Sequence, residues 1–413
     1  MRNPPPPPLN KGGRISIVLA GIGGMGAVYL EALLGDLGSG RFRIAGAADP
    51  FPERCPKLDV LARLGIPVYP DLEGFYARDT ADLAIISSPH HFHATQTILA
   101  LSRGSHILCE KPAAVTIQDS LAMRAAERQS GRRVSVGYQW SFNPAIQELK
   151  RDILSGRFGR ARRVRCLYLW PRDFAYYARN AWAGRLKDDT GAWILDGPAN
   201  NAMAHDLHNI FYLLGGAVET SARPIRAEAE LCRAYPIENY DTAAARIWTD
   251  AGAEILFLAT HVPEAERGPV CSFGFEYGTV FIEGRKTPIR AEFADGTEKE
   301  YGAPDAEPLR KLWMAIDGVR TGERPLCGLE AAESQTLGIN GLQDSAPEVI
   351  PFPADLVRET GEEAGRRLAV EGLDAIFAAA YETWRLPSEI GTPWSRCGKA
   401  VDLTSYDRFP SRP

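Results

Sequence analysis

The sequence predicts an α/β protein: an N-terminal Rossmann domain with a doubly wound parallel sheet, then a C-terminal α/β domain with an open, mostly antiparallel sheet. Three observations support this. In the first 140 residues, short apolar runs alternate with helical patterns, which is typical of a parallel sheet covered on both faces. A glycine-rich turn, AGIGGMG, follows the first apolar run. After about residue 160, strand-like segments with frequent alternation are separated by turn residues.

The first domain is expected to contain five main strands and a short one between helices. Because crossovers in a parallel sheet are right-handed, a doubly wound sheet is the expected topology. Helical patterns occupy 25–37 and 53–65, and further helices are expected to begin near His93, Thr116 and Pro144. The expected strands are 14–21, 43–49, 67–70 (the short one), 81–88, 105–110 and 132–139.

The second half is expected to hold six strands followed by helices. These strands are 160–170, 225–235, 243–250, 252–262, 271–284 and 289–296, and the helices are 308–322, 328–343 and 361–384. We therefore expect four segments: a disordered Pro-rich arm (1–13), an NAD(P)-binding domain (14–140), a substrate and oligomerisation domain (141–345) and a helical extension (346–413).

The composition excludes several classes of protein. The 413 residues are 45% hydrophobic and 24% charged, which is the balance of a globular protein. A formal net charge of -5 without a basic block argues against nucleic-acid binding. No apolar run approaches the ~20 residues of a membrane helix.

The N-terminus and the cysteines predict a cytoplasmic protein. MRNPPPPPLNKGG has no apolar core and does not resemble a secretory signal. Its five prolines favour an extended mobile arm, with docking on a neighbouring subunit as the alternative. The seven cysteines are scattered without a CxxC pair, which indicates isolated thiols in a reducing compartment.

The glycine loop predicts a dinucleotide site. Its residues are Gly21, Ile22, Gly23, Gly24, Met25 and Gly26, and the first, third and last form G-x-G-x-x-G between a strand and a helix. Asp49 ends the second strand, where a carboxylate accepts hydrogen bonds from ribose hydroxyls and disfavours a 2′-phosphate. NAD is therefore expected, and Arg54 keeps NADP as an alternative. A glycine-rich turn that binds nothing is the other interpretation.

Further motifs resemble the glucose–fructose oxidoreductase / inositol dehydrogenase / MocA (Gfo/Idh/MocA) family. They are AGIGGMG, AADPFPERC, ISSPHHFHATQTILALSRGSHILCEKPAAVT, VGYQWSFNPAIQELKRDILSGRFG and NAMAHDLHNIFYLLGG, with a weaker echo at 308–345. The resemblance implies a Rossmann domain followed by a domain with an open sheet that often mediates dimers or tetramers. It also implies NAD(P)-linked oxidation or reduction of sugars, cyclitols and related polyols.

Lys111 is the first catalytic candidate. It lies in E-K-P (110–112) at the carboxyl end of a strand, where ligands of doubly wound sheets bind. Its ammonium group can bind a substrate hydroxyl and stabilise the developing alkoxide. The alternative is a surface lysine paired with Glu110. The resemblance adds cofactor contacts from Ser88, Pro89, His90, His93, Glu110 and Lys111.

His205 is the second catalytic candidate. A helix is expected to carry Asn201, His205 and His208 on one face. The resemblance aligns His205 with the family's histidine, a general acid or base. It aligns Asn201 and His208 with family aspartates, so the family's Asp–His–Lys set is incomplete here. Asp196 and Asp206 are close in sequence but off this face or a turn away.

Aromatic residues are expected to contribute to the substrate site. Tyr138 and Trp140 follow the last strand of the first domain, and Tyr168 and Trp182 lie in an aromatic-rich stretch before the expected catalytic helix. Packing in the core or at the seam between domains is the alternative. A metal site formed by the histidines is disfavoured, because HExxH is absent and the resemblance places His90–His93 near the nicotinamide.

The predicted function is hydride transfer between NAD (or NADP) and a hydroxyl or carbonyl of a sugar, cyclitol or glycoside, with His205 and Lys111 handling the proton. A small carbohydrate-like substrate and a homodimer or homotetramer are expected. One alternative is a redox-neutral glycosidase or lyase that oxidises its sugar transiently. Another is a non-catalytic nucleotide-sensing protein.

Overall fold

The computed structural model describes residues 13–362 and 365–411, and it divides into two compact units. Unit 1 runs to Phe142 and includes 307–333, whereas unit 2 holds 143–306 and the residues from 334 onward. Apart from residue 13, the expected Pro-rich arm (1–13) lies outside the described residues.

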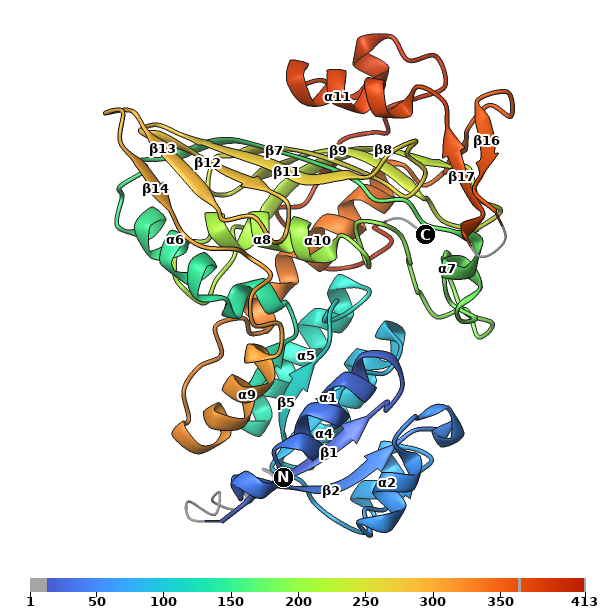
Figure 1. Cartoon of the computed structure of the whole chain (residues 1–413). Coiled ribbons are helices and arrows are strands. Elements are labelled where there is room, and N and C mark those ends of the chain that lie inside the picture. Colours follow the sequence, from blue (N-terminus) through green and yellow to red (C-terminus); the bar gives the residue numbers. More distant parts are fainter. Residues whose placement is uncertain (1–12, 363–364, 412–413) are drawn as a thin grey trace. The chain divides into compact units, whose positions relative to one another are not determined.

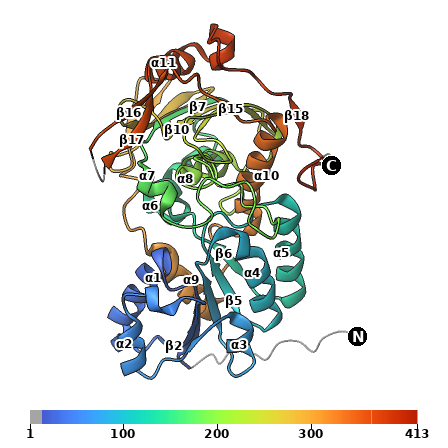
Figure 2. The same cartoon turned by 90° about the vertical axis from the view of Figure 1, so that its right-hand side faces the viewer.

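Unit 1 contains a six-stranded parallel sheet in the order β3-β2-β1-β4-β5-β6, which confirms the predicted Rossmann topology. Helices cover both of its faces, with α1, α2 and α9 on one and α3, α4 and α5 on the other (Figure 2). The strands are β1 (Ile15–Ala20), β2 (Phe42–Ala48), β3 (Val68–Tyr69), β4 (Leu83–Ile86), β5 (His106–Cys109) and β6 (Val134–Val136). The helices are α1 (Gly24–Gly35), α2 (Leu58–Arg63), α3 (Leu72–Tyr76), α4 (His93–Ser102), α5 (Ile117–Ser130) and α9 (Arg310–Thr321).

Helix α9 belongs to unit 1, although the sequence placed its residues in the second domain. Leu312, Ile316 and Val319 are buried in the same core cluster as residues of β1 and α1. These three residues recur at the spacing of one helical face, so α9 covers apolar surface that the first 142 residues leave open. A linear domain boundary near residue 140 therefore misses this return of the chain.

Unit 2 is built on a ten-stranded, mostly antiparallel sheet, as predicted. Its main order is β14-β13-β12-β11-β7-β10-β9-β8-β15, with β18 also paired to β8. Only the pairs β7–β10 and β8–β15 are parallel among the described strands of this sheet. The strands are β7 (Ala161–Leu169), β8 (Pro224–Arg233), β9 (Thr242–Thr249), β10 (Glu254–Thr260), β11 (Arg267–Phe275), β12 (Gly278–Glu283), β13 (Arg290–Phe293), β14 (Glu298–Glu300), β15 (Ile350–Pro351) and β18 (Val401–Asp402).

Two of the expected elements of unit 2 differ in the structure. The expected strand 271–284 is a hairpin of β11 and β12, because the chain turns at 276–277. The expected helix 361–384 begins only at Leu373. Residues 367–370 instead form β17, which pairs with β16 in a separate two-stranded sheet. The remaining elements are β16 (Val357–Thr360), β17 (Arg367–Val370), α6 (Pro144–Leu154), α7 (Phe174–Ala178), α8 (Ala204–Leu214), α11 (Leu373–Thr383) and α10 (Leu329–Ser345), whose first residues lie in unit 1.

The large sheet of unit 2 carries helices on both faces. Helices α6, α8 and α10 lie on one face and α11 lies on the other (Figure 1). Phe377 and Tyr381 of α11 are buried in a cluster with sheet residues such as Leu167 and Leu256. The C-terminal extension therefore covers part of a sheet face that would otherwise expose apolar side chains.

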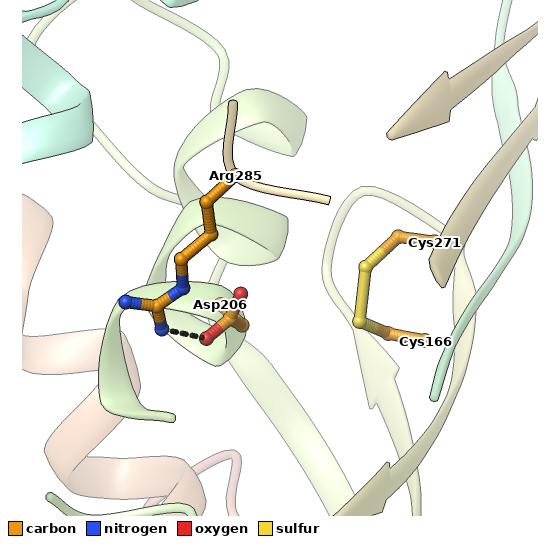
Figure 3. Close-up of a disulfide and its surroundings, with 4 residues drawn as sticks. All are labelled: Cys166, Asp206, Cys271 and Arg285. Carbon is orange, nitrogen blue, oxygen red and sulfur yellow. Dashed lines mark hydrogen bonds and ion pairs between the residues drawn. A yellow bond between two sulfur atoms is a disulfide. The ribbon is translucent and has the colours of Figure 1, made fainter. Parts of the chain in front are cut away.

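A disulfide joins the neighbouring strands β7 and β11. Cys166 and Cys271 face each other in the antiparallel register and are bonded, as Figure 3 shows. The expectation of isolated thiols is therefore wrong for this pair, because register brings together residues 105 positions apart. The cysteine pattern consequently gives no argument for a reducing compartment.

Within the described ranges, no helix is long and apolar enough to cross a membrane.

Candidate active site

Three loops of unit 1 begin at a common edge of its sheet. Ala20 of β1 pairs with Ile86 of β4, and Ile86 pairs with Cys109 of β5. The residues after these positions open the glycine loop, the 87–93 loop and the E-K-P segment. The sheet order reverses at β1 and β4, which is where doubly wound sheets bind their ligands.

The glycine loop has the geometry of a phosphate cradle. A Cβ on Gly26 would lie 2.0 Å from the Gly21 carbonyl oxygen, and Gly21 has a left-handed φ of +80°. Gly23 caps α1, and neither it nor Gly24 has an atom within 4 Å of an added Cβ. The N-terminus of α1 thus offers backbone N–H groups beside open space, which fits a dinucleotide pyrophosphate. Ile22 is fully buried, and Met25 is exposed.

Asp49 connects the end of β2 to the glycine loop. Its carboxylate accepts hydrogen bonds from the backbone N–H groups of Ile22 (2.9 Å) and Phe51 (2.8 Å). Each carboxylate oxygen has a second lone pair, so the group can still accept from a ribose hydroxyl. Arg54 extends into solvent with its side chain 74% exposed, and its guanidinium lies over the Phe51 ring.

His93 connects two of the three loops. Its Nδ1 lies 2.8 Å from the carbonyl oxygen of Pro112, and its Nε2 lies 2.9 Å from that of Ser88. Burial lowers the pKa of His93, and the hydrogen bonds to the two carbonyl oxygens oppose that shift. The imidazole therefore fixes the 87–93 loop against the E-K-P segment. Its predicted cofactor contact, like those of Ser88, Pro89 and the buried His90, stays a prediction.

Glu110 is a buried acid with an internal cation. Its Oε1 accepts hydrogen bonds from Tyr29 and from Lys311 of α9, and Lys311 Nζ also donates to the Gly137 carbonyl oxygen (2.9 Å). Burial opposes ionisation of Glu110, but the charge of Lys311 and the two hydrogen bonds hold its pKa below the usual value. The Glu110 carboxylate therefore connects the end of β5 to Tyr29 of α1 and to Lys311 of α9.

Lys111 adjoins Glu110, and its positive charge is one of the interactions that lower the pKa of that carboxyl. Its backbone N–H donates to Glu110 Oε2 (3.1 Å), while the buried cation beside that carboxylate is Lys311. Lys111 is half-buried, and it precedes a cis peptide bond to Pro112. Lys111 thus follows β5 at the sheet edge where the three loops begin.

The aromatic residues after β6 are part of a core. Tyr138 is 0% exposed and Trp140 is 2% exposed. Burial raises the pKa of the Tyr138 hydroxyl well above its ordinary value. These observations favour the packing alternative, and the predicted substrate contacts of Tyr138 and Trp140 stay predictions.

In unit 2, the predicted catalytic helix is shorter than expected. Helix α8 begins at Ala204, so it carries His205 and His208 but not Asn201. Residues 197–203 form turns, in which the N–H groups of Asn200 and Asn201 donate to the Gly197 carbonyl oxygen. The expectation that all three residues share one helical face is wrong for Asn201. Pro198 lacks an N–H group, and the chain closes turns here before the helix begins.

Asn201 contacts a carboxylate that sequence spacing had set aside. Its Nδ2 donates to Asp196 Oδ1 at 2.8 Å, and Asp196 Oδ2 accepts from the Gly184 N–H at 2.7 Å. Asp196 is 2% exposed. The turns before α8 thus place a buried carboxylate behind the Asn201 amide, one turn before His205.

His208 belongs to a buried network on α6 and α8. Its ring stacks on Tyr212, whose hydroxyl accepts from Gln147 (2.7 Å). Lys150 is fully buried, and its Nζ donates to the carbonyl oxygens of Tyr212 and Thr220. Burial, with the charge of Lys150, lowers the pKa of His208 well below its usual value. His208 is therefore neutral, and its predicted substrate contact stays a prediction.

Asp206, next to His205, pairs with an arginine from the sheet. Arg285 follows β12, and its Nη2 lies 3.0 Å from Asp206 Oδ2, as Figure 3 shows. Burial raises the pKa of Asp206 to about 6, although the charge and hydrogen bond of Arg285 oppose that shift. The guanidinium of Arg285 also lies over the rings of Tyr168 and Trp170, at 5.3 and 4.8 Å from their centroids.

The aromatic-rich stretch before α8 forms a platform in unit 2. The rings of Tyr168 and Trp170 stack at 5.1 Å with an angle of 7° between their planes. Tyr168 is buried, while Trp170 and Trp182 are half-buried. In the described parts of the chain, no group of three or more His, Cys, Asp or Glu side chains is arranged to hold a metal ion.

Comparison with known proteins identifies the nucleotide-binding unit. The GFO_IDH_MocA model, described as "Oxidoreductase family, NAD-binding Rossmann fold", matches residues 15–138. Residues 15–138 are therefore similar to the NAD-binding Rossmann domain of the Gfo/Idh/MocA oxidoreductases.

Two curated relatives illustrate the similarity. The "1-carboxy-3-chloro-3,4-dihydroxycyclo hexa-1,5-diene dehydrogenase" of Comamonas testosteroni is 33% identical over 200 residues, which is 48% of this chain and 48% of that protein. The "Inositol 2-dehydrogenase 1" of Saccharopolyspora erythraea is 28% identical over 342 residues, covering 77% of this chain and 89% of its own.

Solved structures share the fold of this chain. The WlbA dehydrogenase from Bordetella pertussis, in complex with NADH and UDP-GlcNAcA, superposes with a TM-score of 0.66 at 23% identity, over 83% of this chain and 100% of its own. A levoglucosan dehydrogenase complex with NADH gives 0.67 at 18% identity, over 81% and 97%.

Three charged residues were not predicted from the sequence as members of the site. Asp196 had been noted, but it reaches Asn201 only because the chain turns between them. Lys311 and Arg285 contact residues 201 and 79 positions away. No local pattern signals such pairs, although a lysine within the apolar face of a helix is an unusual feature.

Proposed function

We propose that this protein transfers hydride between NAD and a hydroxyl or carbonyl group of a sugar, cyclitol or glycoside. The observation that supports this most strongly is the common edge at which the glycine loop and Lys111 stand. The names of the relatives, which include inositol and levoglucosan dehydrogenases, agree with such a substrate. Residues 21–26 and Asp49 would hold the cofactor, and NAD when bound accepts or returns the hydride.

His205 and Lys111 would handle the oxygen and its proton. In oxidation, His205 takes the proton of the substrate hydroxyl as general base, and in reduction it returns that proton as general acid. The Lys111 ammonium donates a hydrogen bond to the same oxygen and stabilises the negative charge that develops there. The Asn201 amide, held by Asp196, supplies a fixed polar group one turn before His205.

Two experiments test these roles. In the first experiment, the protein is given NAD or NADP together with each member of a panel of sugars, cyclitols and glycosides, and formation of the reduced nicotinamide is followed by its absorbance. We expect net NADH formation with at least one polyol. His205→Gln and Lys111→Met should each lower kcat by roughly 10²–10⁴-fold, as expected for lost proton transfer or charge stabilisation. Unchanged turnover in both variants contradicts the assignment.

A second candidate is a redox-neutral lyase or glycosidase that oxidises its sugar only transiently. The family resemblance implies aspartates at positions 201 and 208. What favours this candidate is that residue 201 is instead an amide bound to Asp196, and that residue 208 is a buried, neutral histidine. Product formation without net NADH accumulation would support this reaction over simple oxidation.

The assembly is also a proposal. A homodimer or homotetramer is expected from the family resemblance, and light scattering of the purified protein tests it. A monomer at micromolar concentration contradicts it.

A further inference from the structure

Arg172 is a half-buried cation without an anionic partner. It follows β7, and its guanidinium lies 3.6 Å from the Trp170 ring centroid and 4.7 Å from that of Tyr176. Its Nε is buried and has no acceptor, and its side chain forms no ion pair or hydrogen bond with any described residue. Arginines withdrawn from water usually gain a carboxylate in exchange, so this one is unusual.

A second cation lies beside it. The guanidinium of Arg179 is 3.7 Å from the Tyr176 ring centroid, so both arginines contact the same ring. The Asp196 carboxylate lies within ion-pair distance of Arg179, with 3.9 Å between Asp196 Oδ2 and Arg179 Nη2, while the Asp173 carboxylate accepts a hydrogen bond from the Tyr176 N–H (2.7 Å). We call Trp170, Arg172, Tyr176 and Arg179 the arginine–aromatic cluster. Of its two guanidinium groups, that of Arg179 has a carboxylate of a described residue within 4.0 Å and that of Arg172 has none.

Burial and the charges of the cluster shift the pKa values of Arg172 and of the neighbouring His261. Burial lowers the pKa of the Arg172 guanidinium. His261, which is 1% exposed and packs against Tyr176, also has a strongly lowered pKa, caused by burial and then by the charges of Arg172 and Arg179. The neighbouring histidine is therefore neutral and adds no further positive charge.

Two chains of contacts connect the cluster to the residues around His205. From Arg179, the contacts run through Asp196 to the Asn201 amide. From Trp170, they run through Arg285, whose guanidinium lies over the Trp170 ring, to Asp206. Figure 3 shows the Arg285–Asp206 pair at the start of α8. Both chains lie within unit 2 and end on the turn or helix that carries His205.

The chemistry of the cluster selects its ligand. A guanidinium stacked on aromatic rings keeps its N–H edge available, and that edge matches the oxygens of a carboxylate or phosphate. Half-buried aromatic faces pack against the C–H face of a polyol ring. A neutral sugar leaves Arg172 unpaired, whereas an anionic ring supplies the missing charge.

We propose that the substrate is an anionic polyol ring, bearing a carboxylate or a phosphate, and that Arg172 and Arg179 bind this group while His205 faces a ring hydroxyl. The part of this inference that places His205 at a ring hydroxyl rests on the proposed function. The anion site itself can be tested without turnover.

The test compares ring pairs that differ in charge. The probes are D-glucose, D-glucuronate and D-glucose 6-phosphate, together with D-galactose and D-galacturonate. Binding to the NAD-loaded protein is measured by calorimetry, and NADH formation is measured in parallel. The variants are Arg172→Gln and Arg172→Lys, with Arg151→Gln on the exposed side of α6 as the matched control.

The quantity to compare is the ratio of the affinity for an anionic ring to the affinity for its neutral counterpart. Arg172→Gln should lower this ratio by about 10- to 100-fold, the loss expected for a charge-assisted pair. Arg172→Lys should recover part of it, since lysine keeps the charge without the planar fork. Arg151→Gln should leave the ratio unchanged. The carboxylate and phosphate arms then tell which anion the cluster accepts.

Failure is distinguishable for the two proposals. If the wild-type protein binds no anionic ring better than its neutral counterpart, or if Arg172→Gln leaves the ratio unchanged, the anion site is wrong. If anionic rings bind through Arg172 but no NADH or other product forms, the site stands and the proposed function is wrong. A denaturation scan of each variant identifies any loss of binding that comes from unfolding.

Discussion

Gly26 shows how narrowly one backbone position is specified. A methyl group there would lie 2.0 Å from the Gly21 carbonyl oxygen and 2.7 Å from the Ser87 hydroxyl, so the start of α1 would have to shift. Gly21 provides a left-handed backbone conformation, and Gly23 and Gly24 leave open space in front of the loop. The loop therefore combines a packing requirement with a binding requirement, and the two can be separated experimentally.

Gly26→Ala should weaken NAD binding by at least about 10-fold, because α1 and its N-terminal N–H groups move away from the loop. Gly35→Ala, at the exposed end of the same helix with nothing within 4 Å, is the control and should stabilise slightly or not at all. NAD titration by calorimetry measures the effect. Equal NAD affinity in both variants would show that the clash is relieved without cost.

Asn201→Asp should impair the protein in a pH-dependent manner. The new carboxylate would face Asp196 across the 2.8 Å contact, and two adjacent carboxylates resist joint ionisation. We expect kcat/KM to fall about 10-fold at pH 8 and to recover in part towards pH 5.5, where the pair shares a proton. Asn201→Ala, which removes the hydrogen bond without adding charge, should lack this recovery; a parallel loss in both variants at every pH rules out the repulsion.

At the scale of elements, α9 is joined to β5 by a buried ion pair. Lys311 is 1% exposed and binds Glu110 and the Gly137 carbonyl oxygen. The pair links α9 to Glu110, the residue that directly follows β5, so it holds together parts of unit 1 that are far apart in sequence. A buried ion pair adds little net stability, but removing one partner is strongly destabilising because the other charge is then left unpaired in the core.

Lys311→Met should destabilise unit 1 by roughly 3–5 kcal/mol, because it leaves Glu110 charged and unpaired in the core. The double variant Glu110→Gln/Lys311→Met should recover most of this loss, since the amide carries no charge. Urea unfolding followed by circular dichroism measures both. If the double variant is no more stable than the single one, the loss comes from packing and not from the unpaired charge.

The elements also show how far the sequence alone could lead. The strands of unit 1 and the glycine loop were predictable because their signals are local: apolar runs, helix periodicity and fixed glycine spacing. Residues 271–284 were mistaken for one strand because Glu276 and Tyr277, at the turn, are not typical turn residues. Residues 361–384 were mistaken for one helix because a hairpin and a helix of mixed polarity give similar patterns over 10–25 residues (roughly the length of one helix or one hairpin). Asp196, Lys311 and the Cys166–Cys271 bond depend on tertiary register, which no single segment encodes.

At the scale of the whole molecule, the two units differ in how they respond to acid. In unit 1, burial lowers the pKa of His93 and brings that of His106 to about 4. In unit 2, His208 and His261 are likewise lowered by burial, but Asp206 and Asp241 are raised by burial to about 6. Histidines with depressed values lose stability as pH falls below 6.5, whereas carboxyls with raised values gain it between pH 6 and 4.

Acidification from pH 7 to pH 5 should therefore weaken unit 1 more than unit 2. Each depressed histidine costs up to about 1.4 kcal/mol per pH unit below 6.5. Burial also raises the pKa of Glu127 in unit 1 and of Glu230 in unit 2, so the expected difference between the units rests on Asp206 and Asp241. Hydrogen exchange, corrected for intrinsic rates, should show larger losses of protection in β1, β4 and β5 than in β7, β9 and β10. Equal losses in the two sheets contradict this balance of charges.

The return of residues 307–333 to unit 1 has a consequence for biosynthesis. A ribosome adding about 5–20 residues per second needs roughly 10–30 s to pass from residue 142 to α9. During that interval the nascent sheet lacks the apolar face of Leu312, Ile316 and Val319, and Glu110 lacks its cation. Unit 1 therefore closes its core only after most of unit 2 has been synthesised, and until then the growing chain carries an uncovered apolar patch.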